Sequence, residues 1–257
     1  MHPHKLWRRY EECRPDELAA IVAETPVAIW PMGLIEHHGW HLPVGFDTIK
    51  AQRICLRLIE RTGGVLLPPL YWGWGGDGGH ADFKWTHYRK NDVSGSIIRE
   101  VCEQLVTFGF RSIVALAGHG PYHEILDEQL AYLRPRHPDV LFLFGLEIDI
   151  AGTEPGLKMD HAAIEETSLG LELLPDLVDL HALKPGHNAA TEWPQTVTPP
   201  TSSPYPSLVL NPESPLFSQA GQDARLARAD RVNAGVERVI AILAQQIETF
   251  GNGTKHE

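Results

Sequence analysis

Short apolar segments alternate with helical patterns along most of this 257-residue chain. Four apolar segments predict buried strands, at residues 27–30, 65–70, 112–117 and 140–144. Helices are predicted at residues 48–61, 94–108, 124–133, 161–174 and 224–250. Repeated strand-then-helix units build a parallel sheet with helices on both faces. We therefore expect an α/β protein with a three-layer α/β/α architecture, a mainly parallel sheet and a single domain over residues 1–257.

Three segments fall outside this alternation. Residues 71–92 are rich in Gly and Trp and predict a long loop. Residues 194–215 contain too many prolines for regular structure. They predict either a lid over the site or an arm packed on a neighbouring subunit. The tail, residues 251–257, is expected to be frayed.

The composition limits the classes of function that this chain can serve. A formal net charge of −11 argues against nucleic acid and against an anionic membrane surface, because both partners require a basic face. There is no run of about 18 apolar residues that could span a membrane, and the N-terminus lacks the apolar stretch of a signal peptide. Cys13, Cys55 and Cys102 are far apart, which indicates buried thiols in a reducing compartment. We expect a soluble, cytoplasmic protein.

Polar clusters follow the predicted strands at three places. Glu36, His38 and Asp47 lie in the sequence E-H-H-G-W-H-L-P-V-G-F-D after the first strand. His119 stands in the tripeptide G-H-G directly after the third strand. The sequence D-H-A-A-I-E-E-T-S at 160–168 begins the helix that follows the fourth strand. Because the carboxyl ends of parallel strands meet at one edge of a sheet, we expect the three clusters to converge there.

These clusters supply carboxylate and imidazole donors and no thiolate. Such a set suits Zn²⁺, Mn²⁺ or Fe²⁺ rather than a soft metal. A carboxylate such as Asp47 can bridge two ions that lie about 3.5–4 Å apart. Ionisable groups at a strand end are costly unless they are paired or bound to a cation. The sequence therefore predicts a metal site at this edge of the sheet.

The same three motifs resemble those of the creatininase family of metal-dependent hydrolases. Residues 36–48 look like the family signature E-Q-H-G-x-H-L-P-x-x-x-D. The G-H-G at 118–120 is similar to the family's N-G-H-G turn, and residues 161–168 are similar to its H-A-G-E-x-E-T-S helix start. The motifs occur in the same order, and the resemblance spans roughly residues 21–180. It implies a creatininase-like fold and a metal-dependent hydrolase.

The resemblance also implies a dinuclear centre in which Asp47 bridges two divalent ions. Zn²⁺ is the first choice, with Mn²⁺ or Fe²⁺ as alternatives. Creatininase itself uses a Glu at the position of Pro121, so we choose Glu166, the Glu of the family's E-T pair, as the fifth ligand. The complete expected ligand set is Glu36, His38, Asp47, His119 and Glu166.

Other residues are expected to transfer protons during the reaction or to contact the substrate. His161 corresponds to the His of the family's H-A-G motif, which implies a proton-handling or oxyanion-stabilising role. Glu124 is the second candidate for the proton shuttle, and Glu165 is an alternative. The expected substrate contacts come from the Gly- and Trp-rich loop and from the turn after His119; they are His80, Trp85, Tyr122 and His123. The loop could instead form a subunit contact.

The chain departs from the family pattern at Ala117, Pro121, Ala163 and Ile164. These departures cluster in the expected substrate pocket and spare the four strongest ligands. They indicate a retained metal centre with a substrate other than creatinine.

The expected reaction is attack by a metal-bridging hydroxide that opens a small polar cyclic substrate at an amide C–N bond. One alternative is hydrolytic C–C or lactone-like ring opening of an oxidised cyclic polyol such as a keto-inositol, as in 3-dehydro-scyllo-inosose hydrolases. An alternative of another class is a non-catalytic metal-binding subunit of a larger complex. The resemblance further implies a homo-oligomer, often a hexamer in this family.

Overall fold

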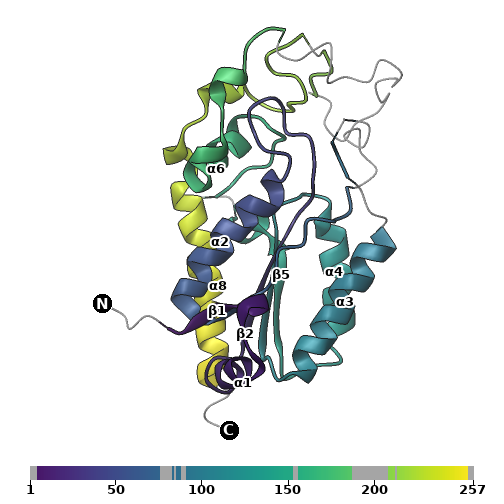
Figure 1. Cartoon of the computed structure of the whole chain (residues 1–257), viewed down its shortest axis with the longest axis vertical. Helices are drawn as coiled ribbons and strands as arrows, with labels where there is room; N and C mark the ends of the chain where they lie inside the picture. Colours follow the sequence, from purple (N-terminus) through teal and green to yellow (C-terminus); the bar gives the residue numbers. More distant parts are fainter. Residues whose placement is uncertain are drawn as a thin grey trace.

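Five parallel strands form the central layer of the part of the chain that the structure describes (Figure 1). This computed structural model describes residues 5–75, 83, 85–87, 91–152, 156–186, 208–211 and 213–253. The strand order across the sheet is β1-β3-β2-β4-β5, and all neighbours are parallel. The strands are β1 (Trp7–Arg9), β2 (Val27–Met32), β3 (Gly64–Leu66), β4 (Ser112–Ala117) and β5 (Leu141–Leu146). The predicted α/β class is confirmed.

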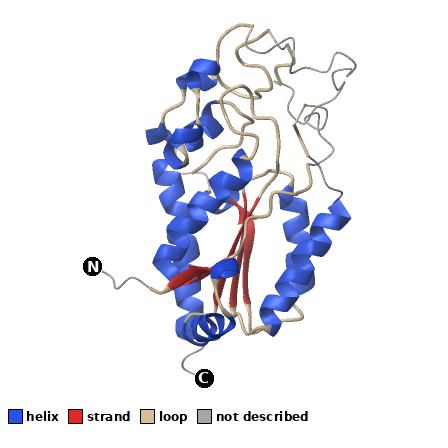
Figure 2. Ribbon diagram, viewed as in Figure 1, coloured by secondary structure: helices blue, strands red, loops and turns tan. Residues whose placement is uncertain are grey.

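Helices cover both faces of this sheet (Figure 2). In Figure 1, α2 and α8 lie on one side of the strands, and α3 and α4 lie on the other. The α-helices are α1 (Pro15–Glu24), α2 (Phe46–Thr62), α3 (Asn91–Thr107), α4 (Tyr122–Leu133), α5 (Glu147–Ala151), α6 (Ile164–Leu173) and α8 (Asn233–Gly253). The short 3₁₀ helices are η1 (Tyr10–Glu12), η2 (Pro175–Leu177), η3 (Leu180–Ala182), η4 (Ala224–Leu226) and η5 (Ala229–Arg231).

The two faces of the sheet bury separate hydrophobic cores. Successive side chains of a strand point to opposite faces, so Ile29 of β2 packs in the core with α2 and α8. Its neighbour Trp30 packs in the core with α3 and α4. Every residue of β2 and β4 is buried. Continuous apolar runs are typical of parallel strands covered on both faces, which is why the sequence identified these two strands.

Several element boundaries differ from the predicted ones. β3 ends at Leu66, before Pro68, because a proline lacks the N–H that the ladder needs. α6 begins at Ile164 rather than at residue 161, because the backbone of His161 pairs instead with that of Ala220. α8 begins at Asn233 rather than at residue 224, and two short 3₁₀ helices, η4 and η5, precede it. β1, α1 and α5 were not predicted.

Two predicted segments lie partly or wholly outside the described residues. Most of the Pro-rich segment, including residues 194–207, is not described. α8 extends to Gly253 and therefore includes the first part of the expected frayed tail, whereas residues 254–257 are not described.

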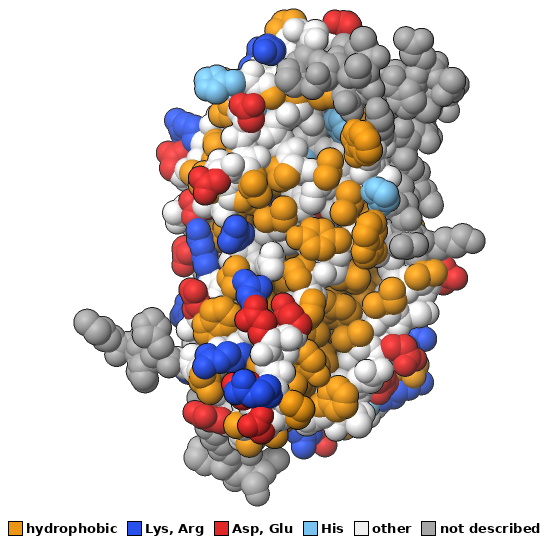
Figure 3. Space-filling model, viewed as in Figure 1, with side chains coloured by type: hydrophobic (Ala, Val, Ile, Leu, Met, Phe, Trp, Pro, Cys, Tyr) orange, Lys and Arg blue, Asp and Glu red, His pale blue; other side chains and the backbone are white. Residues whose placement is uncertain are grey.

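Apolar side chains are prominent on the face of the molecule shown in Figure 3, where they cover much of the middle. Exposed large apolar side chains in the described part of the chain include Val44, Trp72, Trp85 and Met159. No helix among the described residues is long and apolar enough to cross a membrane.

Candidate metal centre

A pocket of about 490 Å³ brings together residues from all three polar clusters of the sequence. Its wall includes Glu36 from the loop after β2, Gly118 and His119 after β4, and Glu147 after β5. His161 and Glu166 line the same pocket. The predicted convergence of residues from distant strand ends is therefore present, since the strands involved are neighbours in the sheet.

Asp47 lies at the centre of the cluster because two glycines let its backbone approach two adjacent strand ends. A Cβ atom at Gly33, after β2, would lie 2.5 Å from the backbone N of Thr48 and 2.8 Å from the carbonyl carbon of Asp47. A Cβ atom at Gly118, after β4, would collide with the carbonyl oxygen of Asp47. The first turn of α2 can lie this close to the ends of β2 and β4 only because both positions lack a side chain.

The two carboxylate oxygens of Asp47 face different imidazoles. Oδ2 lies 2.8 Å from His119 Nδ1, which is also 3.2 Å from Glu36 Oε2. Oδ1 lies 3.2 Å from His38 Nε2, which is also 3.5 Å from Glu166 Oε2. We call Glu36, Asp47 and His119 the His119 group, and His38, Asp47 and Glu166 the His38 group. Within each group the ligand atoms lie within 4.8 Å of one another.

These distances fit pairs of protein atoms that bind the same metal ion. Two atoms that bind one tetrahedral zinc ion at about 2.0–2.1 Å are about 3.3–3.4 Å apart. The imidazole–carboxylate distances of 2.8–3.5 Å lie around this value. One carboxylate with an oxygen in each group is also the arrangement that a bridging ligand requires. The residues present therefore fit two divalent ions held by nitrogen and oxygen donors.

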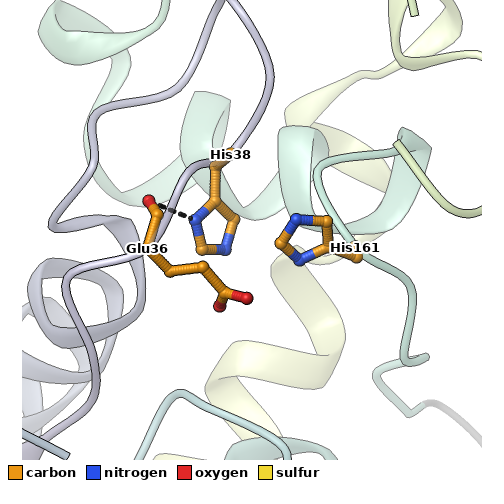
Figure 4. Close-up of side chains that lie close together, drawn as sticks. All are labelled: Glu36, His38 and His161. Carbon is orange, nitrogen blue, oxygen red and sulfur yellow. Dashed lines mark hydrogen bonds between the residues drawn. The ribbon is translucent and has the colours of Figure 1, made fainter. Parts of the chain in front are cut away.

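The orientation of His38 supports a ligand role (Figure 4). Its Nδ1 donates a hydrogen bond of 3.1 Å to the backbone oxygen of Glu36. This bond fixes the ring and, in the neutral imidazole that can bind a metal, leaves the lone pair on Nε2, which points toward the carboxylates. Nε2 is buried and has no hydrogen-bond partner among the described residues.

His161 lies beside His38, with ring centroids 4.6 Å apart (Figure 4). Its Nε2 donates a 3.0 Å hydrogen bond to the backbone oxygen of His37, so Nδ1 carries the lone pair. His161 also forms a ligand-like group with Glu36 and His38. The geometry therefore allows either the expected proton-handling role or metal ligation.

The electrostatic field of the pocket favours positive charge. Burial by itself lowers the pKa of His38, but Asp47 and Glu166 raise it to about 9. Burial acts in the same way on His119, and Glu36 and Asp47 raise its pKa to about 10. Burial raises the pKa of Asp47, but the two imidazoles hold it below its usual range. A cluster that stabilises protonated imidazoles so strongly also attracts metal cations.

Lys50 and Glu147 are parts of the centre that were not predicted from the sequence. Lys50 Nζ lies 2.7 Å from Glu166 Oε1, 3.1 Å from Glu147 Oε1 and 3.8 Å from Asp47 Oδ1. Burial lowers the pKa of Lys50, but these carboxylates raise it well above the usual value. The signal in the sequence was a lysine three residues after Asp47, on the helix side that continues with Ile54 and Leu58.

Asp160 fixes the beginning of α6 and with it Glu166. Its carboxylate accepts hydrogen bonds from the backbone N–H groups of Glu165, at 2.7 Å, and Glu166, at 3.0 Å. Glu166 Oε2 accepts a further hydrogen bond of 2.8 Å from the backbone N–H of Ala162. The side chain of Glu166 is therefore held between this N–H and the ammonium of Lys50.

Of the other predicted site residues, some line the pocket, some lie outside its wall and one is not described. Glu124 and His123 line the pocket, and His123 Nδ1 lies 3.1 Å from Asp149 Oδ2. Tyr122, which was expected to contact substrate, is fully buried outside the pocket wall, and its hydroxyl donates to the Gly33 backbone oxygen. Trp85 is 56% exposed and is not part of the wall. His80 lies outside the described residues.

A pocket at the ends of parallel strands, with paired carboxylates and imidazoles that fit divalent cations, is typical of metal-dependent hydrolases. The protein family described as "Creatininase: Creatinine amidohydrolase" matches residues 11–247. The chain therefore belongs to the creatininase family of metal-dependent hydrolases.

Two individual proteins are similar to this chain over much of its length. The creatinine amidohydrolase of Pseudomonas putida is 28% identical over 224 residues, which cover 79% of this chain and 83% of that protein. The mycofactocin precursor peptide peptidase of Mycolicibacterium smegmatis is 30% identical over 173 residues, which cover 64% of each protein.

Solved structures share the fold. A crystal structure of creatinine amidohydrolase (creatininase) has a TM-score of 0.73 at 23% identity and covers 95% of this chain and 97% of its own. A structure described as "Creatininase Mn" has a TM-score of 0.72, covering 95% and 98% of the two chains. A mutant creatininase of "Zn-Zn type" has a TM-score of 0.70, covering 96% and 98%. The identity to both of these structures is 23%.

Replacing Gly118 by Ala should weaken metal binding without unfolding the protein. The added methyl group forces the first turn of α2, and with it Asp47, away from β4. We expect affinity to fall by about 10- to 100-fold, as for other changes that misplace a metal ligand. Competition with a chelating dye measures the affinity, and far-UV circular dichroism reports the fold.

Gly251→Ala is the matched control, because a Cβ atom there meets no other heavy atom within 4 Å. It should leave metal affinity unchanged. Wild-type affinity in Gly118→Ala would contradict the argument that this glycine positions Asp47.

Proposed function

We propose that this member of the creatininase family is a dinuclear amidohydrolase that opens a small polar cyclic substrate at an amide C–N bond. One observation carries the proposal: Asp47 presents one oxygen to each of two imidazole–carboxylate groups within one pocket. Zn²⁺ is the first choice for both positions, with Mn²⁺ and Fe²⁺ as alternatives.

The two groups divide the proposed ligands. Glu36, Asp47 and His119 would hold one ion, and His38, Asp47 and Glu166 would hold the other. Divalent ions bound there would polarise a substrate carbonyl and lower the pKa of water to near neutrality. The buried pocket wall keeps these charged side chains away from bulk water, which strengthens their electrostatic effect on a substrate.

His161 and Glu124 are the proposed proton carriers. The hydrogen bond from His161 Nε2 to the His37 backbone oxygen leaves Nδ1 as the basic atom. In this role Nδ1 accepts a proton from the attacking water and delivers it to the leaving nitrogen. Glu124 lines the pocket from the first turn of α4 and can serve as the second carrier.

The pocket supports a small substrate. Its volume of about 490 Å³ is near the lower end of the range for small-molecule sites, about 300–1,000 Å³. Trp74 and Met159 add apolar surface to the charged wall. Pro121, where creatininase itself has a Glu, lies in this wall, which supports a substrate other than creatinine.

Two alternatives have specific support. The relationship to a mycofactocin precursor peptide peptidase supports hydrolysis of a peptide amide bond by the same groups. Ring opening of an oxidised cyclic polyol such as a keto-inositol expels no nitrogen. The altered pocket wall near Pro121 supports this reaction, because a wall that differs from that of creatininase need not serve a nitrogen leaving group. A non-catalytic metal-binding subunit of a larger complex is the alternative from another class.

The remaining proposals concern the whole protein. We propose a single domain over residues 1–257 that acts in the cytoplasm as a homo-oligomer, with a hexamer as the first choice. Exposed Trp72 and Trp85 and the apolar face in Figure 3 support contacts between subunits.

A substrate panel tests the proposed reaction. Metal-loaded protein is incubated separately with creatinine, a second cyclic amide such as a hydantoin, a formamidopyrimidine, a diketo-inositol and a short peptide. The measured products are creatine, the ring-opened N-carbamoyl acid, formate, the ring-opened polyol acid and new peptide termini. We expect turnover of a cyclic amide other than creatinine that exceeds turnover of creatinine. No turnover of any compound, despite two bound ions per chain, would contradict the hydrolase and favour the non-catalytic subunit.

Asp47→Ala should remove both ions and all activity while the protein remains folded. The substitution deletes the carboxylate shared by the two groups, whereas the cores on both faces of the sheet are left intact. Metal content by atomic emission, turnover and circular dichroism measure the three effects. Binding of both ions at wild-type affinity would show that Asp47 is not the bridging ligand.

His161→Gln should lower turnover by about 10²-fold or more, which is typical for loss of a general acid–base group. Metal content should change little, because the proposed ligands all remain. Parallel measurement of kcat and of bound metal separates the two roles open to His161. An equal loss of metal and turnover would identify it as a ligand.

A further inference from the structure

Lys50 introduces a fixed positive charge into the metal centre. It is 3% exposed and lies on the buried side of α2, with its ammonium 5.0 Å from the centroid of the Phe46 ring. It contacts three carboxylates from three helices: Asp47 of α2, Glu147 of α5 and Glu166 of α6. The ammonium of a lysine in this position repels any cation that enters the pocket.

The ammonium is not placed symmetrically with respect to the two groups. It lies 2.7 Å from Glu166 Oε1 and 3.8 Å from Asp47 Oδ1. Both of these carboxylates serve the His38 group, and Oδ1 is the Asp47 oxygen that faces His38. The His119 group uses the other oxygen, Oδ2. The charge of Lys50 therefore bears most directly on the His38 group.

Lys50 also forms a hydrogen bond with one of the two carboxylate oxygens of Glu166. Oε1 accepts the short hydrogen bond from Nζ, which leaves Oε2 to face His38 Nε2 at 3.5 Å. Glu166 can therefore offer one oxygen to an ion in the His38 group while the other oxygen stays with Lys50. A carboxylate shared with an ammonium is a weaker cation ligand, because part of its charge is already compensated.

Building on the proposed dinuclear function, we propose that Lys50 makes the two metal positions unequal, so that the His38 group binds its ion more weakly than the His119 group. Glu147 opposes this effect. Its carboxylate lies 3.1 Å from the ammonium and compensates part of the positive charge. Removing Lys50 should therefore strengthen the weaker position, and removing the charge of Glu147 should weaken it further.

Titration of chelator-treated full-length protein with Mn²⁺ tests this inference. Calorimetry gives the affinity of each step, and electron paramagnetic resonance distinguishes an isolated ion from a spin-coupled pair. In the wild type we expect two steps, with the spectrum of isolated Mn²⁺ at one equivalent and coupling only after the second.

The variants have opposite expected effects. Lys50→Met should strengthen the weaker step by about tenfold or more, as expected from removal of a unit charge a few ångströms from a dication. Glu147→Gln should weaken the same step. A role confined to packing would instead weaken both steps in both variants. Lys50→Arg keeps the charge and should keep the two steps unequal.

Arg53→Met is the matched control. Arg53 is an exposed residue on the same helix, so its loss changes the net charge by the same amount without touching the centre. It should leave both steps unchanged. If Lys50→Met does not fold, Lys50→Met/Glu147→Gln removes both charges together, and Glu147→Gln alone still tests the direction of the effect.

Different results of this titration would contradict the role of Lys50 and the dinuclear function on which that role rests. Two steps of equal affinity in the wild type, or a weaker second step in Lys50→Met, would overturn the role of Lys50 and leave the dinuclear function standing. Binding of fewer than two ions per wild-type chain would overturn the proposed dinuclear function itself.

Discussion

The burial of four carboxylates at one edge of a parallel sheet is the constraint on which the rest of this centre depends. Glu36, Asp47, Glu147 and Glu166 are all nearly inaccessible to solvent. Buried carboxylates are costly unless positive charge lies close to them. The chain places two imidazoles and one ammonium among them. The raised pKa values of His38 and His119 have the same origin, since the carboxylates favour any positive charge within reach. Divalent cations compensate the negative charge of these carboxylates more fully than protons do, because each carries two positive charges.

The topology of the fold reduces the cost of this arrangement. Three of the four carboxylates stand in the first turn of a helix: Asp47 in α2, Glu147 in α5 and Glu166 in α6. The N-terminus of a helix carries partial positive charge from its unpaired N–H groups, which stabilises a carboxylate there. In a parallel α/β sheet, the helices that follow the strands begin at the same edge. The fold thus gathers several favourable positions for carboxylates in one pocket, and the glycines at 33 and 118 allow the closest approach.

The sequence predicted those parts of the fold and site that depend on local pattern and on topology alone. β2 and β4 were predicted because long apolar runs are distinctive, whereas β1 and α5 are too short to give a pattern. Glu36, His38, Asp47 and His119 were grouped because adjacent strand ends must meet. Lys50 was missed because its partner Glu166 is 116 residues away, and one lysine on an amphipathic helix usually indicates a solvated position. Tyr122 was misplaced because adjacency to His119 in sequence does not fix direction. Successive residues of a helix turn by about 100°, and this ring points into the core.

The count of protein ligands links the proposed metal centre to hydrolysis rather than to a structural role. In the proposed assignment each ion would have three protein ligands, with Asp47 common to both. Structural zinc sites are closed by four protein ligands, whereas catalytic sites keep a position for water or substrate. Pro121 supplies no side-chain donor that could close the His119 group, and Lys50 holds the second oxygen of Glu166 away from the His38 group. All five proposed ligands line the same pocket as His161 and Glu124. The open coordination positions would therefore be shared with the groups that can carry the proton, which is the juxtaposition that hydrolysis of an amide requires.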